Sequence, residues 1–347
     1  MTIPPSPYHK KEEAMSYLLK PFDNGKIKLK NRLVMPPMAT AKSDADGRVS
    51  REVLDYYEEK SKGGYISLII IEHSYISKDG KASLNQLSVD DDSMIEGLKK
   101  LSETIHKNGS KAVMQINHAG SNARKEVNKK PVGPSAILNP RKITDLIPTE
   151  LTKDDIKEII NNFKNAAIRV QKAGFYGVEI HSAHSYLLNQ FLSPLTNKRT
   201  DEYGGDIHGR IKIHLEIIEA VRKAVGNDYP VLLRLGATDD RDDGLTINDA
   251  IEAAICFEKA GVDMLDISGG MCGYIPSNSN EQGYFSLQSE TIKNAVGIPV
   301  ILTGGITEAQ SADKLLAEGK ADLIGVGRAV LKDSAWAEKT ITSLQNL

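Results

Sequence analysis

A histidine pair followed closely by a tyrosine is the part of this sequence best suited to chemistry. His181, His184 and Tyr186 stand in the segment GVEIHSAHSYLLNQFLSPL. Two imidazoles can donate N–H bonds to one oxygen atom, and His181 and His184 share a face if the chain begins a helical turn there. A phenol, whose reference pKa is about 10, stays protonated at neutral pH and can deliver a proton. These residues therefore predict a site that holds a substrate oxygen and protonates a neighbouring atom.

Two other interpretations of the histidine pair stay open at this point. Such a pair can be structural, with its nitrogens satisfied inside the core. It can also bind a metal, but no acidic or cysteine third ligand stands at a useful spacing. We therefore expect no metal.

Two glycine-containing segments further along the chain could receive an anion. One is ILTGGIT, with Gly304 and Gly305, and the other is IGVGRAV, with Gly327 and Arg328. Glycine lets backbone N–H groups approach an anion closely, a following helix adds a favourable dipole, and an arginine adds a charge-assisted hydrogen bond. The pattern predicts a phosphate site, although the same glycines could simply make tight strand-to-helix turns.

The elements that must position these residues alternate between short apolar runs and helical patterns. Eight runs rich in Val, Ile and Leu suit strands buried on both faces of a parallel sheet. They cover residues 32–35, 66–71, 112–116, 177–180, 231–235, 264–267, 300–302 and 323–326. An open doubly wound sheet is the alternative, but the first run leads into MPPMAT, which lacks a glycine-rich dinucleotide fingerprint. The pattern therefore favours an α/β fold, a single (β/α)8 TIM barrel, whose site lies at the C-terminal ends of its strands.

Helix signals separate these runs. Apolar residues recur at helical spacing in 156–172, 211–225 and 249–260, and Thr152, three residues before Asp155, marks a helix start. Glycine is expected to end helices at Gly109, Gly174, Gly226, Gly261 and Gly319. Regularly spaced helix starts and ends of this kind are expected for a repeated strand-helix unit.

The N-terminal part of the chain differs from the rest. Residues 1–15 are polar and contain three prolines, so we expect a loose arm before a barrel domain at 16–347. Asn24-Gly25, between short apolar runs, predicts a β-hairpin. This hairpin would close the bottom of the barrel.

Composition excludes several classes of protein. A net charge of -2 without a long basic run argues against nucleic-acid binding. The two cysteines cannot build a disulfide framework, which suits a reducing cytoplasm. The longest apolar runs are too short to span a bilayer, and the first residues lack a signal core. We therefore expect a cytoplasmic protein without a membrane segment.

Residues 181–205 resemble the signature of the old yellow enzyme family. After the histidines and the tyrosine come Ser193-Pro194, Asn197, Arg199, Asp201 and Tyr203-Gly204-Gly205. PFDNGKIKLKNRLVMPPM resembles the family's opening strand, AVMQINHAG its third, VLLRLG its fifth, and TGGI with GVGRA its phosphate loops. The resemblance covers most of the chain, and it implies a barrel that holds FMN.

The resemblance also implies a role for each matching residue. His181 and His184 hold the substrate's carbonyl or nitro oxygen, and Tyr186 is the proton donor. Gln115 faces the flavin pyrimidine edge, and Arg234 lies near N1 and O2, where a cation stabilises the reduced ring. The remaining flavin contacts are Pro37 and Met38 at the ring and Gly304, Gly305, Gly327 and Arg328 at the phosphate.

Three positions depart from the family pattern. Ala39 stands where relatives often have Thr or Cys beside flavin O4. Ser185 replaces the usual glycine before the tyrosine, which bears on the turn because glycine alone adopts positive φ freely. His73 stands where a small residue is common, and it either lines the flavin or packs.

The implied function is that of an NAD(P)H-dependent ene-reductase. NADH or NADPH gives a hydride to FMN N5, and an activated alkene (an enone, enal or nitroalkene) receives it. The alternatives are an FMN barrel with other redox chemistry, such as oxidative demethylation or dehydrogenation, and a barrel that binds a phosphorylated ligand without redox work. The resemblance further implies a small-molecule substrate and a homo-oligomer.

Overall fold

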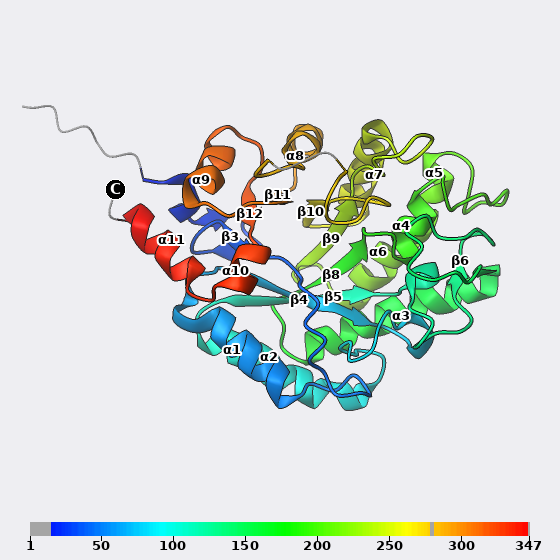
Figure 1. The fold of residues 1–347 in the computed structure, drawn as a ribbon, viewed down its shortest axis with the longest axis horizontal. Helices are drawn as coiled ribbons and strands as arrows, with labels where there is room; N and C mark the ends of the chain where they lie inside the picture. Colours follow the sequence, from blue (N-terminus) through cyan, green and yellow to red (C-terminus); the bar gives the residue numbers. More distant parts are fainter. Residues whose placement is uncertain (1–14, 278–280, 346–347) are drawn as a thin grey trace, which may run out of the picture.

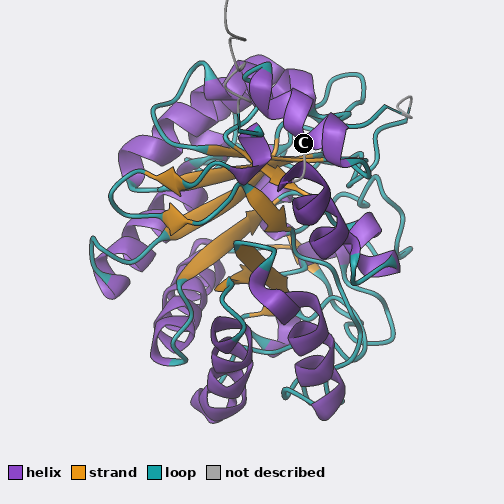
Figure 2. Cartoon of the chain, turned by 90° about the vertical axis from the view of Figure 1, so that its left-hand side faces the viewer, coloured by secondary structure: helices purple, strands orange, loops and turns teal. Residues whose placement is uncertain are grey.

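The computed structural model, which describes residues 15–277 and 281–345, is built around a closed barrel of eight parallel strands. Figure 1 shows the strands in the middle of the molecule, and Figure 2 shows helices surrounding them. The barrel strands are β3 (Leu33–Met35), β4 (Leu68–Tyr75), β5 (Lys111–Asn117), β8 (Gly177–Ser182), β9 (Val231–Gly236), β10 (Met264–Ser268), β11 (Val300–Thr303) and β12 (Leu323–Gly325). Each pairs with the next, and β12 pairs with β3 to close the ring. All eight expected strands and the predicted TIM barrel are confirmed.

Helices connect the barrel strands, and two more, α10 and α11, follow the last strand. They are α1 (Arg51–Ser61), α2 (Ile95–Lys107), α3 (Lys153–Lys172), α4 (Leu187–Leu192), α5 (Ile207–Arg210), α6 (Lys212–Val225), α7 (Ile247–Ala260), α8 (Ser286–Lys293), α9 (Ala309–Ala317), α10 (Arg328–Lys332) and α11 (Trp336–Gln345). Thr152 caps α3 in a capping box with Asp155, as predicted. No helix of the described residues combines the length and the apolar character needed to cross a bilayer.

The N-terminal hairpin forms the floor of the barrel. β1 (Phe22–Asp23) and β2 (Lys28–Leu29) pair antiparallel around Asn24-Gly25. Ile27 and Leu29 are buried in one apolar cluster with inward residues of the barrel strands, among them Val34 and Leu232. The hairpin therefore closes the N-terminal end, and it leaves the C-terminal end for a site. Most of the expected N-terminal arm, residues 1–14, lies outside the described residues.

Candidate active site

His181 belongs to a barrel strand. β8 pairs with β9 as far as Ser182, with His181 beside Arg234 in the register. The expected helical turn at His181 is therefore wrong, because the ladder holds this backbone extended. The chain turns only afterwards, at His184 and Ser185, whose φ angles are +57° and +67°. Tyr186 returns to an extended conformation and is the N-cap residue of α4.

Ser185 occupies the conformation that glycine adopts most easily. Its N–H donates to Asn189 Oδ1 at 2.7 Å, and its Oγ donates to Asn139 Oδ1 at 2.7 Å. A non-glycine residue at positive φ costs of order 1 kcal/mol or more, so these bonds offset the strain. The turn that aims Tyr186 is thus kept despite the serine.

The turn brings four aromatic rings together at the C-terminal end of the barrel. The His181 centroid lies 5.2 Å from that of His184, edge to face, and 5.1 Å from that of Tyr186. His73, from β4, lies 5.1 Å from the Tyr186 ring. His184 is held by Ser268 Oγ, 2.7 Å from its Nε2. Buried His181 Nδ1 has no hydrogen-bond partner within the described residues, so a donor or acceptor is left for a ligand.

Burial sets the protonation of these groups. It lowers the pKa of His181 well below the usual value, with help from His184, and it does the same for His184, with help from Arg234. Burial also raises the pKa of Tyr186 to about 12. At neutral pH the site therefore holds two neutral imidazoles, each with one N–H, and a protonated phenol.

A buried charged network lies beneath the rings. Arg234 Nε approaches Asp266 Oδ2 at 3.1 Å, with side chains 4% and 0% exposed, but the two atoms are misaligned for a hydrogen bond and have no other partner in the described chain. Gln115 Nε2 donates to Glu179 Oε1 at 2.8 Å. A buried guanidinium with an unmatched N–H fits the cation expected beside an electron-accepting ring, which supports FMN at this position.

The two glycine segments meet at the same end of the barrel. Gly304 and Gly305 have φ of +159° and +68°, and a Cβ on either would lie within 2.8 Å of the Tyr284 ring. Arg328 Nη2 lies 3.3 Å from Tyr284 Oη. This packing alone requires glycine at both positions, so a phosphate role for them stays a proposal. The helix that Arg328 begins, α10, is five residues long and adds little dipole.

The loop after β3 reaches the same place. A Cβ on Gly327 would lie 2.8 Å from Met38 Sδ. Met38, which the resemblance assigns to the flavin ring, therefore lies beside Gly327, which it assigns to the phosphate. Pro37 is partly buried beside it, and Ala39 is exposed at the mouth. Thr40 is turned inward, since its N–H and Oγ both donate to the buried Glu72 carboxylate, at 2.7 and 2.6 Å. These residues thus lie around the C-terminal opening of the barrel.

Sequence reasoning missed the acidic members of this site. Glu179, Asp266 and Glu72 each stand inside an apolar strand run, in GVEIHS, MLDIS and IIIEHSY. Asp and Glu are rarely buried unless they have a partner. A carboxylate inside an apolar strand run is therefore a sign of a buried polar site, and this sign could have identified all three residues. His73, for which lining the flavin and packing were both open, belongs to the cluster of rings with His181 and Tyr186. Among the described residues no group of three or more His, Cys, Asp or Glu could hold a metal ion.

A barrel with a buried cation, neutral histidines and a phenol at its C-terminal mouth is the arrangement that a flavin-dependent oxidoreductase needs. The family model described as the NADH:flavin oxidoreductase / NADH oxidase family matches residues 17–346. The chain belongs to this family, whose members use FMN with NADH or NADPH, so the family and cofactors predicted from the sequence are confirmed.

Individual relatives agree with this assignment. The chain is 40% identical over 329 residues to an NADH oxidase of Thermoanaerobacter brockii, covering 93% of this chain and 50% of that protein. It is 40% identical over 307 residues to an NADPH dehydrogenase of Clostridium acetobutylicum, covering 88% of each. An old yellow enzyme homologue from Zymomonas mobilis has a TM-score of 0.82 at 25% identity, covering 94% of this chain and 92% of that one. The chain thus spans about half the length of the Thermoanaerobacter protein.

Proposed function

We propose that this chain reduces activated alkenes with electrons from NADH or NADPH. The observation that supports this most is the convergence of His181, His184 and Tyr186 beside the buried Arg234. The chemistry that FMN supplies when bound is hydride transfer, from the nicotinamide to the substrate. An enone, enal or nitroalkene fits, because each carries an oxygen that the histidines can hold.

The side chains act on the two ends of such a substrate. The N–H groups of His181 and His184 hold the carbonyl or nitro oxygen and stabilise the charge that develops there. Tyr186 gives its proton to the α-carbon, and its raised pKa keeps that proton in place at neutral pH. Arg234, Gln115, Pro37 and Met38 hold the ring system of FMN, and Gly304, Gly305, Gly327 and Arg328 surround its phosphate.

Anaerobic half-reactions test this proposal. Purified protein should be yellow, should lose its flavin absorbance when mixed with NADH or NADPH, and should regain it with an enone or nitroalkene. Reduction of the oxidised protein by an N-methylamine, without reoxidation by any alkene, would favour oxidative demethylation instead. Colourless protein that binds inorganic phosphate would favour a barrel without redox work.

A further inference from the structure

Two arginines stand at the rim of the ring cluster. Arg124 directly follows Ala123, which belongs to the small apolar cluster against which Tyr186 packs. Arg141 projects from the segment after β6 (Val132–Gly133) toward the loop after β10, where a Cβ on Gly273 would collide with its guanidinium. The next residue in that loop, Tyr274, has its ring 6.0 Å from that of His184.

Arg124 is exposed and Arg141 is partly buried, and neither guanidinium has an acidic partner among the described residues. Asn139 Oδ1 accepts from Ser185 Oγ at 2.7 Å and from the backbone N–H of Arg141 at 3.0 Å. These two bonds tie the segment that carries Arg141 to the turn that aims Tyr186. No carboxylate of the described residues lies within ion-pair distance of Arg124 or Arg141, whereas neighbouring Lys125 pairs with Asp145 at 3.8 Å. The positive charge of both arginines lowers the pKa of Tyr186, against the larger effect of burial. Two cations without an acidic partner therefore lie close enough to Tyr186 to act on its phenol.

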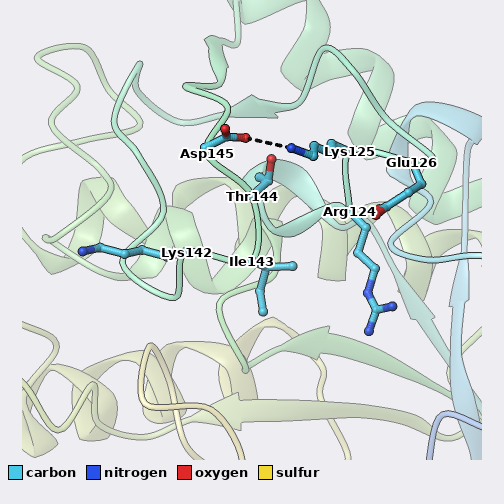
Figure 3. Close-up of a pocket in the computed structure, with 7 residues that line it drawn as sticks. All are labelled: Arg124, Lys125, Glu126, Lys142, Ile143, Thr144 and Asp145. Atoms are coloured by element: carbon cyan, nitrogen blue, oxygen red, sulfur yellow. Dashed lines mark ion pairs between the residues drawn. The ribbon is translucent and has the colours of Figure 1, made fainter.

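A cavity of about 450 Å³ continues outward from Arg124. Residues 124–126 form one of its sides and residues 142–145 the other. In Figure 3 the side chains of Arg124 and Ile143 extend in the same direction, while Lys142 extends away from both. The cavity leaves open volume beside Arg124.

We propose that Arg124 and Arg141 bind an anionic group, a carboxylate or phosphate, carried by the alkene substrate. The proposal rests on the proposed function, since it places the reacting alkene at His181 and Tyr186. A guanidinium presents paired N–H donors that match either anion, and a charge-assisted bond at a partly exposed site is the expected contact. The preferred substrates are then acidic enones or enals with a chain between the two groups.

Two enones that differ only in a terminal carboxylate or carboxamide test this site. In the oxidative half-reaction, Arg124→Met and Arg141→Met should each weaken binding of the carboxylate about tenfold or more and leave the carboxamide unchanged. Lys129→Met, which removes a positive charge five residues from Arg124 and outside the cavity, is the matched control and should change neither. Flavin absorbance and melting temperature check that each variant is folded.

Three outcomes would overturn the subsite. Equal losses for carboxylate and carboxamide would mean a steric role. An equal effect of Lys129→Met would mean that the overall positive charge of this face attracts the anion. Weaker binding of NADH or NADPH alone, in the reductive half-reaction, would assign the arginines to the nicotinamide phosphates. Wild-type protein that reduces neither enone would instead contradict the proposed function.

A second, independent observation concerns His73. Gln86 Oε1 accepts from the Ala82 N–H at 2.7 Å, which fixes the orientation of the amide. Gln86 Nε2 then donates to His73 O at 3.0 Å and to His73 Nδ1 at 2.7 Å. Since Nδ1 accepts, and burial lowers the pKa of His73 to about 4, the ring is neutral and carries its proton on Nε2.

From this geometry we infer that His73 positions the proton of Tyr186. His73 Nε2 lies 3.4 Å from Tyr186 Oη, so its N–H donates to the phenol oxygen. The phenol proton is then left to point at the substrate, and the same N–H stabilises the phenolate after that proton has gone. Gln86 acts one step further out, by fixing the tautomer. This role also rests on the proposed function.

A double-mutant cycle tests His73. His73→Phe should slow alkene reduction about tenfold and leave flavin reduction by NADH unchanged, and His73→Gln, whose amide can donate, should restore most of the rate. In a Tyr186→Phe background, His73→Phe should have no further effect. Additive losses in that background, or no rescue by His73→Gln, would show that His73 only packs. If Tyr186→Phe alone changes nothing, Tyr186 is not the proton donor, and the proposed function fails together with this role; loss in Tyr186→Phe without any loss in His73→Phe would contradict the role of His73 alone.

Discussion

Tyr186→Phe is expected to slow alkene reduction by about 10²–10⁴-fold while flavin reduction by NADH or NADPH proceeds at the wild-type rate. The substitution removes only the hydroxyl, and the ring still packs against Ala82, Ala119 and Ala123. Because the pKa of Tyr186 is raised to about 12, the wild-type phenol is fully protonated at neutral pH and is available as an acid. Without the hydroxyl no other acidic group of the ring cluster can supply the proton, because His181 and His184 are neutral.

Stopped-flow measurement of the two half-reactions separates this role from structural damage. Tyr75→Phe is the matched control, since Tyr75 Oη donates to Asp46 O at the edge of the barrel, away from the rings. That variant should keep both rates. Equal slowing of both half-reactions by Tyr186→Phe would contradict its role as proton donor and would indicate a misplaced ring or flavin.

The fold was predictable because its signal is continuous burial. Barrel strands are covered on both faces, so each appears as a short unbroken apolar run. The ends of the strands were harder to predict where the strand residues near the site are polar. β4 continues to Tyr75, past the expected end at Ile71, because pairing with β5 resumes at Ser74 after a shift in register. A polar stretch such as EHS breaks the apolar pattern, yet it stays in the strand.

The candidate site was predictable only in part, for a related reason. His181, His184 and Tyr186 lie within six positions of sequence, so their spacing could be read directly. The contact of Tyr186 with His73 joins residues from distant elements, and no spacing encodes it. The helical turn expected at His181 failed because strand pairing with β9 outweighs the local preference there.

Arg234→Met should destabilise the protein as well as weaken its hold on FMN. The side chains of Arg234 and Asp266 are 4% and 0% exposed, and Glu179 is buried beside them. Removing one member of a buried ion pair costs about 3–5 kcal/mol, since the remaining charge is left without compensation. We expect a loss of that size in the free energy of unfolding, together with flavin that is lost on dilution.

The pH dependence identifies the cause of this loss. Burial already raises the pKa of Glu179 and of Asp266 above their usual values, and Arg234 opposes the rise at both. Without the arginine both pKa values rise further, so the folded state binds more protons than the unfolded state over a wider range. The loss of stability of Arg234→Met relative to wild type should therefore be smallest below the unfolded pKa of about 4 and should grow as pH rises through the raised folded values.

A second substitution separates stability from flavin binding. Asp266→Asn in the Arg234→Met background removes one stranded carboxylate, so it should recover part of the unfolding free energy and flatten its pH dependence. It supplies no cation, so FMN should remain weakly bound, whereas Arg234→Lys should retain more FMN than either variant. Denaturant unfolding across the pH range and fluorescence of released flavin measure the two effects independently. Recovery of both by Asp266→Asn would show that Arg234 stabilises the barrel and contributes nothing to the flavin.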